Sequence, residues 1–462
     1  MSRPARPNPL PAWLVALVLL AGCTLSPTYQ RPAAPVAAHY PGAPAATTTT
    51  PAAADIGWQR FCADERLGQL VKLALANNRD LRVAVLNVEH SQAQYRISRA
   101  AAVPGVDGSA NFSRSHAAGI SVDRWSASVG STAYEVDLFG RVHSLNQQAL
   151  ESYFATAEAQ RGAQVSLVAN VADVYFTLRL AEEQLRLAQQ TLVTVQESFT
   201  LNQATFNAGA SNELDLRTAD GQVQTARINV LTYQRQIALT RNAMEPLIGC
   251  PLPGGLPAGR AFNDGHLLAD IPAGLPSGLV CRRPDILEAE HTLKAANANI
   301  GAARAACFPS ISLTGSAGAG SSQLAKLFGS GTGVWSFSPQ VSVPVFTGGR
   351  TRAEVDAAKI SRRIEVANYE KAIQTAFREV ADALVAGTSY ANEIEAQAAL
   401  IQAQQRRFEL ATTRYRQGED TYLNVLSAQQ DLYSAQQSRL QAKRNKLASQ
   451  IALYKALGGG WK

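Results

Sequence analysis

The chain contains 462 residues, with 43 Lys and Arg against 36 Asp and Glu, giving a net charge of +7. Because the positive residues are scattered among negative ones rather than clustered, nucleic-acid binding is a poor interpretation. After the first hydrophobic run, no segment is long and apolar enough to form a transmembrane helix, so further membrane contact would have to use strands or lipid.

The first hydrophobic run has the layout of a bacterial lipoprotein signal. Two arginines precede an apolar stretch at 13–20, which is too short to span a bilayer. Ala21 and Gly22 then lead into Cys23. We predict a signal peptide at 1–22, with a diacylglycerol and an N-acyl chain on Cys23. Each CH₂ of such chains that is buried in the bilayer contributes about 0.8 kcal/mol to membrane binding. The alternative is an ordinary cleaved signal followed by a chance cysteine.

A change of composition marks the segment that follows the signal. Residues 23–57 are rich in Pro, Ala and Thr and predict a lipidated, extended and poorly packed tether. Ordered structure is expected from Trp58 onward. Apolar residues at helical spacing run from Leu81 to about Ala102, where a Pro-Gly pair stops the pattern.

Residues 106–138 have the composition of strands. Gly, Ser, Asn and aromatic residues replace Ala, Gln and Leu, and apolar residues alternate with polar ones around Phe112 and Trp125. Alternation at period two predicts two strands, with a turn near Ala118 and Gly119. Each strand has about ten residues, enough for a tilted strand of an outer-membrane barrel.

A very long helix is predicted from 140 to about 206. Its apolar residues step by three and four, which is the seam of a coiled coil. About 65 residues with a rise of about 1.5 Å each would extend roughly 100 Å. Residues 207–211 break the pattern, and a second helix is expected from Glu213 to Ile248.

Residues 58–249 and 284–458 are two copies of one pattern, joined by a Pro/Gly-rich linker at 250–283. An internal repeat of this length predicts two structurally similar halves that pack side by side. The second copy is expected to hold strands at about 310–346 and helices at about 350–457, before a tail at 459–462. The matched segments are 99–104 with 304–309, 137–141 with 344–350, and 206–209 with 415–418. The strands of the second copy are marked by Ile311, Leu313, Val341, Val343 and Val345.

The repeat predicts four strands per chain, which raises the question of how the sheet closes. Four strands cannot form a barrel, and open strand edges are not tolerated in lipid. Two copies would give a barrel filled by side chains, whereas three copies would give twelve strands around a channel. The predicted fold is therefore mostly α with a membrane β-barrel. It is a duplicated helix–β-hairpin–long helix–helix unit whose trimer places a 12-stranded barrel on a long α-helical coiled-coil barrel.

The chain resembles the TolC-like outer-membrane efflux channel family, in its lipidated OprM/NodT-type branch. The matching residues are 275–277 (Leu-Pro-Ser), 282–286 (Arg-Arg-Pro-Asp-Ile), Ala289-Glu290, Gly301, 308–314, 343–350 and the lipobox, the Leu-Leu-Ala-Gly-Cys segment at 19–23. The resemblance implies a homotrimer in the outer membrane that projects into the periplasm. It implies docking on a periplasmic membrane-fusion adaptor fed by an inner-membrane resistance–nodulation–division transporter, with passive exit of solutes through the tunnel.

The turns between the paired helices are the first candidate site. Gly209 and Gly418 are expected to end the long helices, and Ser211 and Asp420 to cap the next ones. The resemblance implies that these turns meet the adaptor. The candidate docking residues are Ala208, Gly209, Ala210, Gln417, Gly418, Glu419 and Asp420.

The second candidate site is a gate at the periplasmic mouth. The family narrows this mouth with acidic side chains, and the matching positions here are Asn424 and Ser427, which are not acidic. In the other half, Asp215 occupies the place equivalent to Asn424 and is the candidate for a ring of three carboxylates. The alternative is an exposed acid favoured by the helix dipole.

The remaining polar residues predict structure rather than chemistry. Arg282, Arg283 and Asp285 are expected to fix the linker onto the following helix. A disulfide between Cys250 and Cys281 is one reading of the cysteines, and plain buried thiols are the favoured one. The six histidines lack metal-ligand spacing and no catalytic signature occurs, so neither a metal site, a further cofactor nor an enzyme is expected.

Three other functions fit parts of the sequence. A non-conducting periplasmic coiled-coil lipoprotein would explain the helices but not the duplicated strand pairs. An outer-membrane duct of a type I protein-secretion system would share the architecture. The lipobox and the Arg-Arg-Pro-Asp block favour small-molecule efflux over that duct. An envelope hydrolase with long helices would need a catalytic constellation that the sequence lacks.

Overall fold

The computed structural model describes residues 24–37, 40, 57–262, 268 and 282–459. The expected signal peptide, the lipid-bearing Cys23 and Cys281 lie outside these residues. The described residues form two compact units. The first takes them from 1–33, 86–158 and 287–371, and the second from 34–85, 159–286 and 372–462. Each unit therefore contains segments of both sequence copies.

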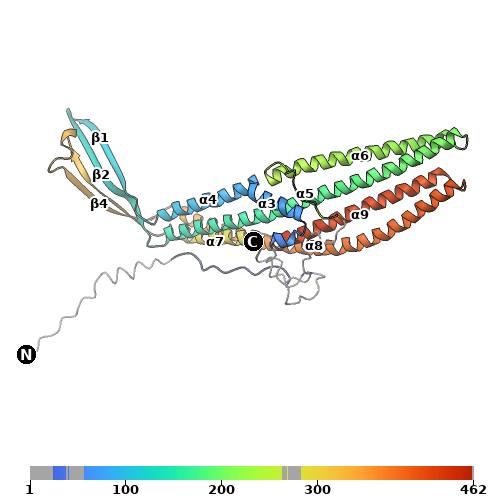
Figure 1. The fold of residues 1–462 in the computed structure, drawn as a ribbon. Coiled ribbons are helices and arrows are strands. Elements are labelled where there is room, and N and C mark those ends of the chain that lie inside the picture. The colour runs from blue at the N-terminus through green and yellow to red at the C-terminus, as the bar shows by residue number, and fades with distance from the viewer. Residues whose placement is uncertain (1–23, 38–39, 41–56, 263–267, 269–281, 460–462) are drawn as a thin grey trace, which may run out of the picture. The chain divides into compact units, whose positions relative to one another are not determined.

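The first unit contains one antiparallel sheet in the order β1-β2-β3-β4 (Figure 1). The strands are β1 (Asp107–Ala117), β2 (Ile120–Val136), β3 (Ser310–Ser321) and β4 (Gly333–Ser342). A two-residue turn joins β1 to β2, with Ala118 and Gly119 both left-handed at φ 49° and 80°, as a tight hairpin requires. A short 3₁₀ helix, η3 (Leu324–Lys326), lies between β3 and β4. Because β2 pairs with β3, the hairpins of both copies form one sheet.

The two faces of this sheet differ in chemistry. On one face, Phe112 packs against Trp125 across the strands, with ring centroids 4.3 Å apart and planes tilted by 32°. On the other face, serine hydroxyls pair across strands, as Ser316 and Ser336 do at 2.9 Å. The apolar face carries Ala110, Phe112, Trp125, Ala127, Val129, Leu313, Ala317, Trp335, Phe337 and Val341. The polar face carries Ser109, Asn111, Ser113, Ser126, Ser128, Ser312, Thr314, Ser316, Ser336, Ser338 and Gln340.

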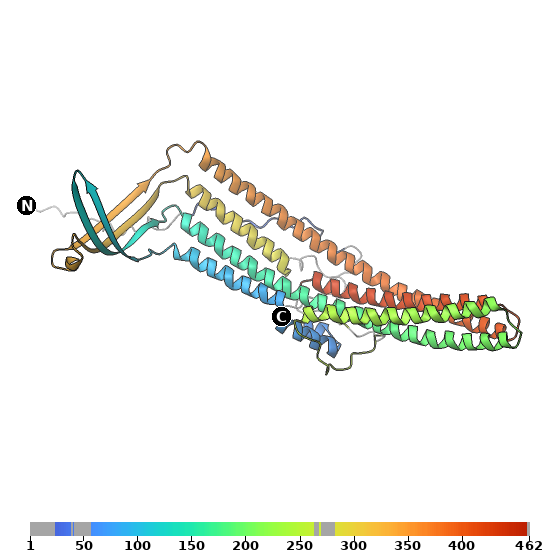
Figure 2. The same cartoon turned by 90° about the horizontal axis from the view of Figure 1, so that it is seen from above.

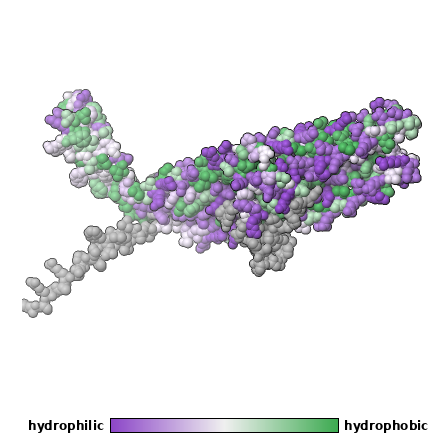
Figure 3. All heavy atoms as spheres, in the orientation of Figure 1, coloured by the Kyte–Doolittle hydropathy of each residue, from purple (hydrophilic) through white to green (hydrophobic). Residues whose placement is uncertain are grey.

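Large apolar side chains of the sheet are open to solvent in the single chain. Trp335 is 80% exposed and Phe337 is 62% exposed. Figure 3 shows apolar residues over much of the sheet, with hydrophilic residues at its free end. An apolar face of this kind marks a surface that meets lipid or protein rather than water.

The helices repeat in length from one copy to the other. Helices α4 and α7 have 22 residues each, α5 and α8 have 67 each, and α6 and α9 have 36 and 35. Their bounds are α4 (Arg79–Ala100), α5 (Arg141–Asn207), α6 (Glu213–Ile248), α7 (Pro284–Ala305), α8 (Arg350–Arg416) and α9 (Tyr422–Ala456). Within the second unit the α5–α6 and α8–α9 hairpins lie side by side (Figures 1 and 2). The predicted duplicated unit with four strands is confirmed.

In the core of the second unit, two short helices pack against the long ones. Helices α2 (Trp58–Phe61) and α3 (Glu65–Asn77) pack there. The rings of Phe61 and Tyr454 stack with centroids 3.9 Å apart. Asp64 caps α3 and also accepts a 2.8 Å hydrogen bond from the Tyr175 hydroxyl, so its buried carboxylate is satisfied. Among the helices that the structure describes, none has both the length and the apolar character needed to cross a membrane.

The last predicted strand ends earlier than expected. The sequence places it up to 346, but β4 ends at Ser342, so Val343 and Val345 lie beyond the strand. Pro344 has no N–H to donate to a ladder. Gly348 and Gly349 then adopt left-handed φ angles of 61° and 87° before α8 begins. The alternation of valines therefore continues into a connection that is not paired within the chain.

The expected poor packing of the 23–57 tether is wrong for its first part. Residues 25–31, here named the strap, lie along the helices of the first unit. Arg304 donates to the Leu25 carbonyl at 2.9 Å and Asn297 donates to the Pro27 carbonyl at 2.7 Å. Arg31 forms an ion pair with Glu290 at 3.0 Å. The composition misled the prediction because two of these three contacts use backbone carbonyls, which any residue type offers, and the third needs only one charged side chain.

Glycine makes room for the strap on α7. The Ser26 hydroxyl lies 3.2 Å from the Ser144 hydroxyl and 3.3 Å from the Ala298 carbonyl that it donates to. A Cβ on Gly301 would overlap both of those hydroxyls. Gly301 therefore lets the strap approach the helix closely.

The described cysteines are free thiols. Cys62 is buried, and burial raises the pKa of its thiol to about 12. Cys250 is half-buried and Cys307 is exposed, so among the described cysteines the expectation of plain buried thiols is met at Cys62 and is wrong for Cys307. Cys307 lies two residues past the end of α7.

Candidate functional site

The first helix-to-helix turn is built around Gly209. This residue is left-handed at φ 72°, and the N–H of Ala210 bonds back to the Thr205 carbonyl at 2.9 Å. That closure satisfies the end of α5. The N-cap of α6 is Asn212, whose Oδ1 accepts from the Asp215 N–H at 2.9 Å. The expected cap, Ser211, is therefore wrong by one residue, because the asparagine side chain reaches the N3 amide.

The second turn repeats this design at Gly418. Its φ is 78°, and the Glu419 N–H bonds to the Arg414 carbonyl at 3.0 Å. Thr421 is the N-cap of α9 and makes no side-chain cap bond. Asp420, expected as the cap, instead lies one residue earlier. Its Oδ1 accepts from the Thr421 N–H at 2.8 Å and from the Asn424 amide at 2.5 Å.

The Asp420 carboxylate is held in its charged form. The Asn424 side chain, then the Thr421 N–H and Arg414, keep the pKa of Asp420 below its usual value. A fixed negative charge therefore lies at the start of α9, where the helix dipole also favours it.

The predicted docking residues are open to solvent in the single chain. All are exposed except Asp420, which is half-buried. The exposed residues are Ala208, Gly209, Ala210, Gln417, Gly418 and Glu419. Small side chains dominate the first turn, so a partner could reach its backbone directly.

The three predicted mouth residues bond to different partners. Asp215 is half-buried and its carboxylate accepts from the Asn212 amide at 3.1 Å. Asn424 binds Asp420, as described above, and the Ser427 hydroxyl accepts from Arg407 at 3.3 Å. Among the described residues, no hydrogen bond or ion pair joins these three to one another. Their convergence in a ring stays a prediction about an assembly of several chains.

Asp215 does influence a pair of tyrosines. Burial, then the neighbouring charge of Asp215, raises the pKa of Tyr415. Burial, then Tyr415 and Asp215, raises the pKa of Tyr422 to about 12. The rings of Tyr415 and Tyr422 lie 5.6 Å apart, so this end of the helices holds an acid beside a neutral aromatic pair.

Sequence reasoning missed the most buried polar contact near the turns. Asn202 on α5 is fully buried, and its Oδ1 accepts a 2.8 Å hydrogen bond from the Tyr415 hydroxyl on α8. Its amide donates to the Ser198 carbonyl at 2.9 Å. The bond ties a helix of the first copy to a helix of the second. An asparagine inside an apolar seam is the signal that could have revealed it.

Tyr415→Phe is expected to loosen this end of the helices. The change leaves the Asn202 Oδ1 buried without its donor, which costs about 1–3 kcal/mol. Hydrogen exchange of residues 199–215 and 408–425 should speed up, while exchange elsewhere is unchanged. Adding Asn202→Leu should restore much of the loss, because both polar partners are then gone. Unchanged exchange in the single variant would show that the bond contributes nothing.

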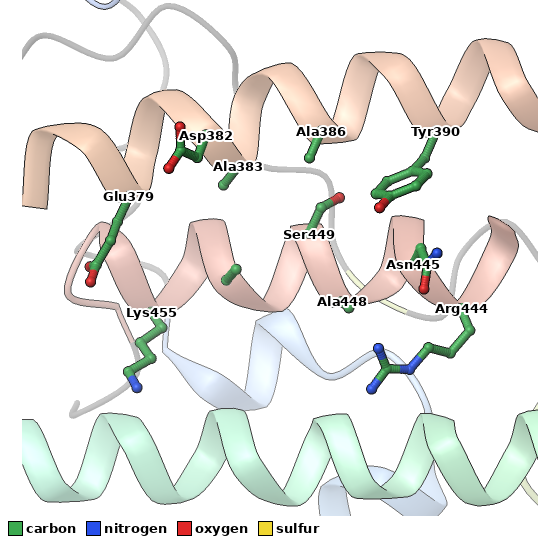
Figure 4. A pocket seen from close by; sticks show the side chains of 11 residues that line it. Glu379, Asp382, Ala383, Ala386, Tyr390, Arg444, Asn445, Ala448, Ser449 and Lys455 are labelled. Atoms are coloured by element: carbon green, nitrogen blue, oxygen red, sulfur yellow. The ribbon is translucent and has the colours of Figure 1, made fainter. Parts of the chain in front are cut away.

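A groove between α8 and α9 has charged residues in its lining and a volume of about 510 Å³. Figure 4 shows Ala383, Ala386 and Ala448 among its lining residues, so the space comes from small side chains. Glu379 pairs with Arg283, and Arg444 pairs with Asp173, each at 2.9 Å. Both contacts are ion pairs between helices or between a helix and the linker. Among the residues that the structure describes, no cluster of His, Cys, Asp and Glu could hold a metal ion.

Comparisons with known proteins agree on one family. The chain matches the family model described as outer membrane efflux protein over residues 70–250 and 275–459. It is 46% identical to the toluene efflux pump outer membrane protein TtgC of Pseudomonas putida, over 97% of this chain and 94% of that protein. It is 40% identical to the cation efflux system protein CusC of Escherichia coli, over 98% and 99%.

Solved structures of such channels are also similar. The open state of the Neisseria gonorrhoeae MtrE outer membrane channel superposes with a TM-score of 0.88 and 39% identity. The match covers 95% of this chain and 99% of that one. A CusC structure matches with a TM-score of 0.87 and 38% identity, over 95% and 100%.

Proposed function

The chain belongs to the outer membrane efflux protein family, and from this premise we propose that it is the outer-membrane channel lipoprotein of a tripartite efflux pump. Three copies form the channel, which gives solutes passive exit to the exterior. A periplasmic membrane-fusion adaptor and an inner-membrane resistance–nodulation–division transporter deliver those solutes. The relatives carry efflux-pump or efflux-system names.

The observation that carries this proposal is the sheet with one apolar and one hydroxyl-rich face. Its outer strands, β1 and β4, each have one edge unpaired within the chain. Such edges are unstable in lipid unless they pair with another chain. A ring of sheets would turn the apolar face to lipid and the serine face to a water-filled interior. Three copies make twelve strands, wide enough for a channel.

The turns at Gly209 and Gly418 are proposed to dock the adaptor. They are the sharp ends of the two helical hairpins, and their backbone is exposed. Asp215, Asn424 and Ser427 are proposed to line the mouth behind them. With no acids at Asn424 and Ser427, closure would rely on Asp215 and on contacts such as Asn202 with Tyr415.

The lipid on Cys23 is proposed as a second attachment to the outer membrane. Paired strands hold the protein far more firmly than acyl chains do, so the lipid aids sorting and assembly. This role stands apart from conduction. A chain exported with an ordinary cleavable signal, and therefore without lipid, is expected to conduct once it has assembled.

Neighbouring residues of β4 test the two faces of the sheet. Phe337 lies on the apolar face and Ser338 on the hydroxyl face. Phe337→Arg is expected to prevent membrane assembly, because an arginine facing lipid at mid-depth costs about 2–4 kcal/mol per chain. Ser338→Arg, the matched control, should assemble and lower single-channel conductance for cations in a planar bilayer.

The full-length wild-type chain provides the reference for this test. It should run as a heat-resistant trimer in detergent and conduct in a planar bilayer. A monomer that never conducts would instead favour the coiled-coil lipoprotein. The reverse pattern, with Ser338→Arg lost and Phe337→Arg assembled, would mean that the two faces are assigned the wrong way round.

A further inference from the structure

We propose that the outer end of the sheet binds the phosphate groups of a glycolipid in the outer leaflet of the membrane, through Arg114 and Lys326. Lipid A, which carries phosphates on a sugar above its acyl chains, is the ligand class that this surface fits. The inference rests on the proposed function, because it uses the apolar face of the sheet as the face that meets lipid. It adds a lipid-binding site to that face.

The topology decides which end of the sheet points outward. Helices α4 and α7 lead into β1 and β3, and strands β2 and β4 lead out into α5 and α8. Because the sheet is antiparallel, all four connections to helices are at one end, and both hairpin connections are at the other (Figure 1). The proposed assembly keeps the helices in the periplasm. The hairpin connections, at 118–119 and 322–332, therefore face the exterior.

This outer end is positively charged. Residues 113–124 and 321–333 include three basic side chains and one acidic side chain, a net charge of +2 with histidine neutral. These are Arg114, Arg124 and Lys326 against Asp123. A trimer would triple that charge around one rim. A concentrated positive charge next to a membrane surface attracts anionic lipid headgroups.

The cation on β1 lies just outside the apolar band. On β3, ten steps separate Ile311 from Ser321, and Ser321 is opposite Trp125. At about 3.4 Å per step and a strand tilt of about 40°, these steps cover roughly 26 Å, the height of the apolar band of an outer-membrane barrel. Arg114 is on the same face, two positions beyond the Phe112 that packs on Trp125. Its side chain is therefore at the depth of the lipid headgroups.

Asp123 holds the Arg114 guanidinium in place without using all of its donors. Nε donates to Oδ1 at 2.6 Å, and Nη2 donates to Oδ2 at 2.7 Å. The arginine side chain is still 66% exposed, and its Nη1 has no partner among the described residues. A guanidinium has five N–H donors in a planar fork, and the same fork binds phosphate oxygens in pairs. Arg114 is thus oriented for a phosphate while it is paired with a carboxylate.

The second cation is on an amphipathic loop. Lys326 is the last residue of η3 and is exposed. The next residue, Leu327, is buried and fixes the loop, whereas Leu324 and Phe328 are 57% and 83% exposed. A lysine between exposed apolar side chains suits a segment that lies in the headgroup layer, with the apolar groups toward acyl chains and the ammonium toward phosphate. Such a mixed surface favours a lipid over a free anion.

Lipid binding to the purified full-length trimer tests this site. Lipid A with both phosphates is expected to stay bound in native mass spectrometry and to raise the temperature at which the trimer is lost. Phosphatidylethanolamine and inorganic phosphate should do so far less. Arg114→Gln and Lys326→Gln should each weaken lipid A binding about fivefold, which is the effect of one basic residue near an anionic surface. Added salt should weaken wild-type binding, because both cations are exposed.

The neighbouring strand offers a matched control. Arg124 is opposite Ser113 and so is on the hydroxyl face. Arg124→Gln removes the same charge from the other side of the sheet and should change lipid A binding by less than about twofold. Asp123→Asn removes the acid but leaves an acceptor for Arg114, so it should tighten lipid A binding.

The outcomes separate the lipid site from the channel. A wild-type trimer that conducts but does not prefer lipid A to phosphatidylethanolamine would overturn the lipid site and leave the channel standing. Equal weakening by Arg114→Gln and Arg124→Gln would also overturn it, because net charge rather than the lipid face would then decide binding. Inorganic phosphate that stabilises the trimer as much as lipid A would make this a site for free anions. If the wild-type chain forms no trimer and does not conduct, the proposed function itself fails.

Discussion

Arg283→Ala is expected to lower the free energy of unfolding by about 3 kcal/mol, the lower end of the range for breaking a buried ion pair. The side chain of Arg283 is only 7% exposed. It forms a two-pronged contact with Asp285, at 2.9 and 2.6 Å, and an ion pair with Glu379 at 2.9 Å. It also donates to the Ala456 carbonyl at 2.8 Å. The substitution therefore removes the contacts of Arg283, the last linker residue, with Glu379 on α8 and with the end of α9.

The adjacent Arg282 is the control for this prediction. It has the same charge but is exposed, so Arg282→Ala should change stability by no more than about 0.5 kcal/mol. Arg283→Lys should lower the free energy of unfolding by an amount between those of the two alanine variants, since lysine keeps the charge but not the planar guanidinium that binds Asp285 through two nitrogens. The measurement is the guanidinium concentration at the midpoint of unfolding in detergent, together with the slope of the unfolding free energy against guanidinium concentration. Equal midpoints for the two alanine variants would contradict a structural role for Arg283.

Gly249→Ala is expected to lower the stability of the fold about as much as Arg283→Ala does, but through backbone strain and steric overlap. Gly249 ends α6 in a left-handed conformation with φ 71°. An added Cβ would overlap the backbone carbonyl of Asn77 and come within 3.0 Å of the Asn78 nitrogen. The backbone strain costs about 1–2 kcal/mol, and the forced shift of α3 adds about 1–3 kcal/mol. The midpoint of heat-induced unfolding should fall accordingly.

Gly209→Ala separates the two contributions. Gly209 also ends a long helix in a left-handed conformation, with φ 72°, but nothing lies within 4 Å of its would-be Cβ. This variant should therefore lose only the strain, about 1–2 kcal/mol. Similar losses for Gly209→Ala and Gly249→Ala would mean that α3 moves away freely and that its packing against the glycine is unimportant.

The elements that sequence reasoning located best are those set by periodic patterns. The step of three and four in the long helices, the alternation around Phe112 and Trp125, and the duplicated motifs are properties of many residues together. Single deviations hardly disturb them. The left-handed glycines at 209 and 418 were equally predictable, because few other residues adopt that backbone conformation.

Features decided by one contact were less predictable. Asn212 rather than Ser211 caps α6, and the choice depends on which side chain reaches the N3 amide. The strap escaped prediction because proline-rich composition says nothing about carbonyls that helices can bind. The proposed mouth residues would meet only in an assembly of several chains, which neither the sequence pattern nor the fold of one chain contains.

The strap also has a consequence for the order of synthesis. Leu25 and Pro27 leave the ribosome among the first residues, yet their donors, Arg304 and Asn297, belong to a helix made hundreds of residues later. Tyr369, which accepts from Arg31, follows later still. The first segment made is thus among the last to find its place. Its docking can be completed only after α7 and the part of α8 that holds Tyr369 have been made, so a fully docked strap reports that synthesis has passed that point.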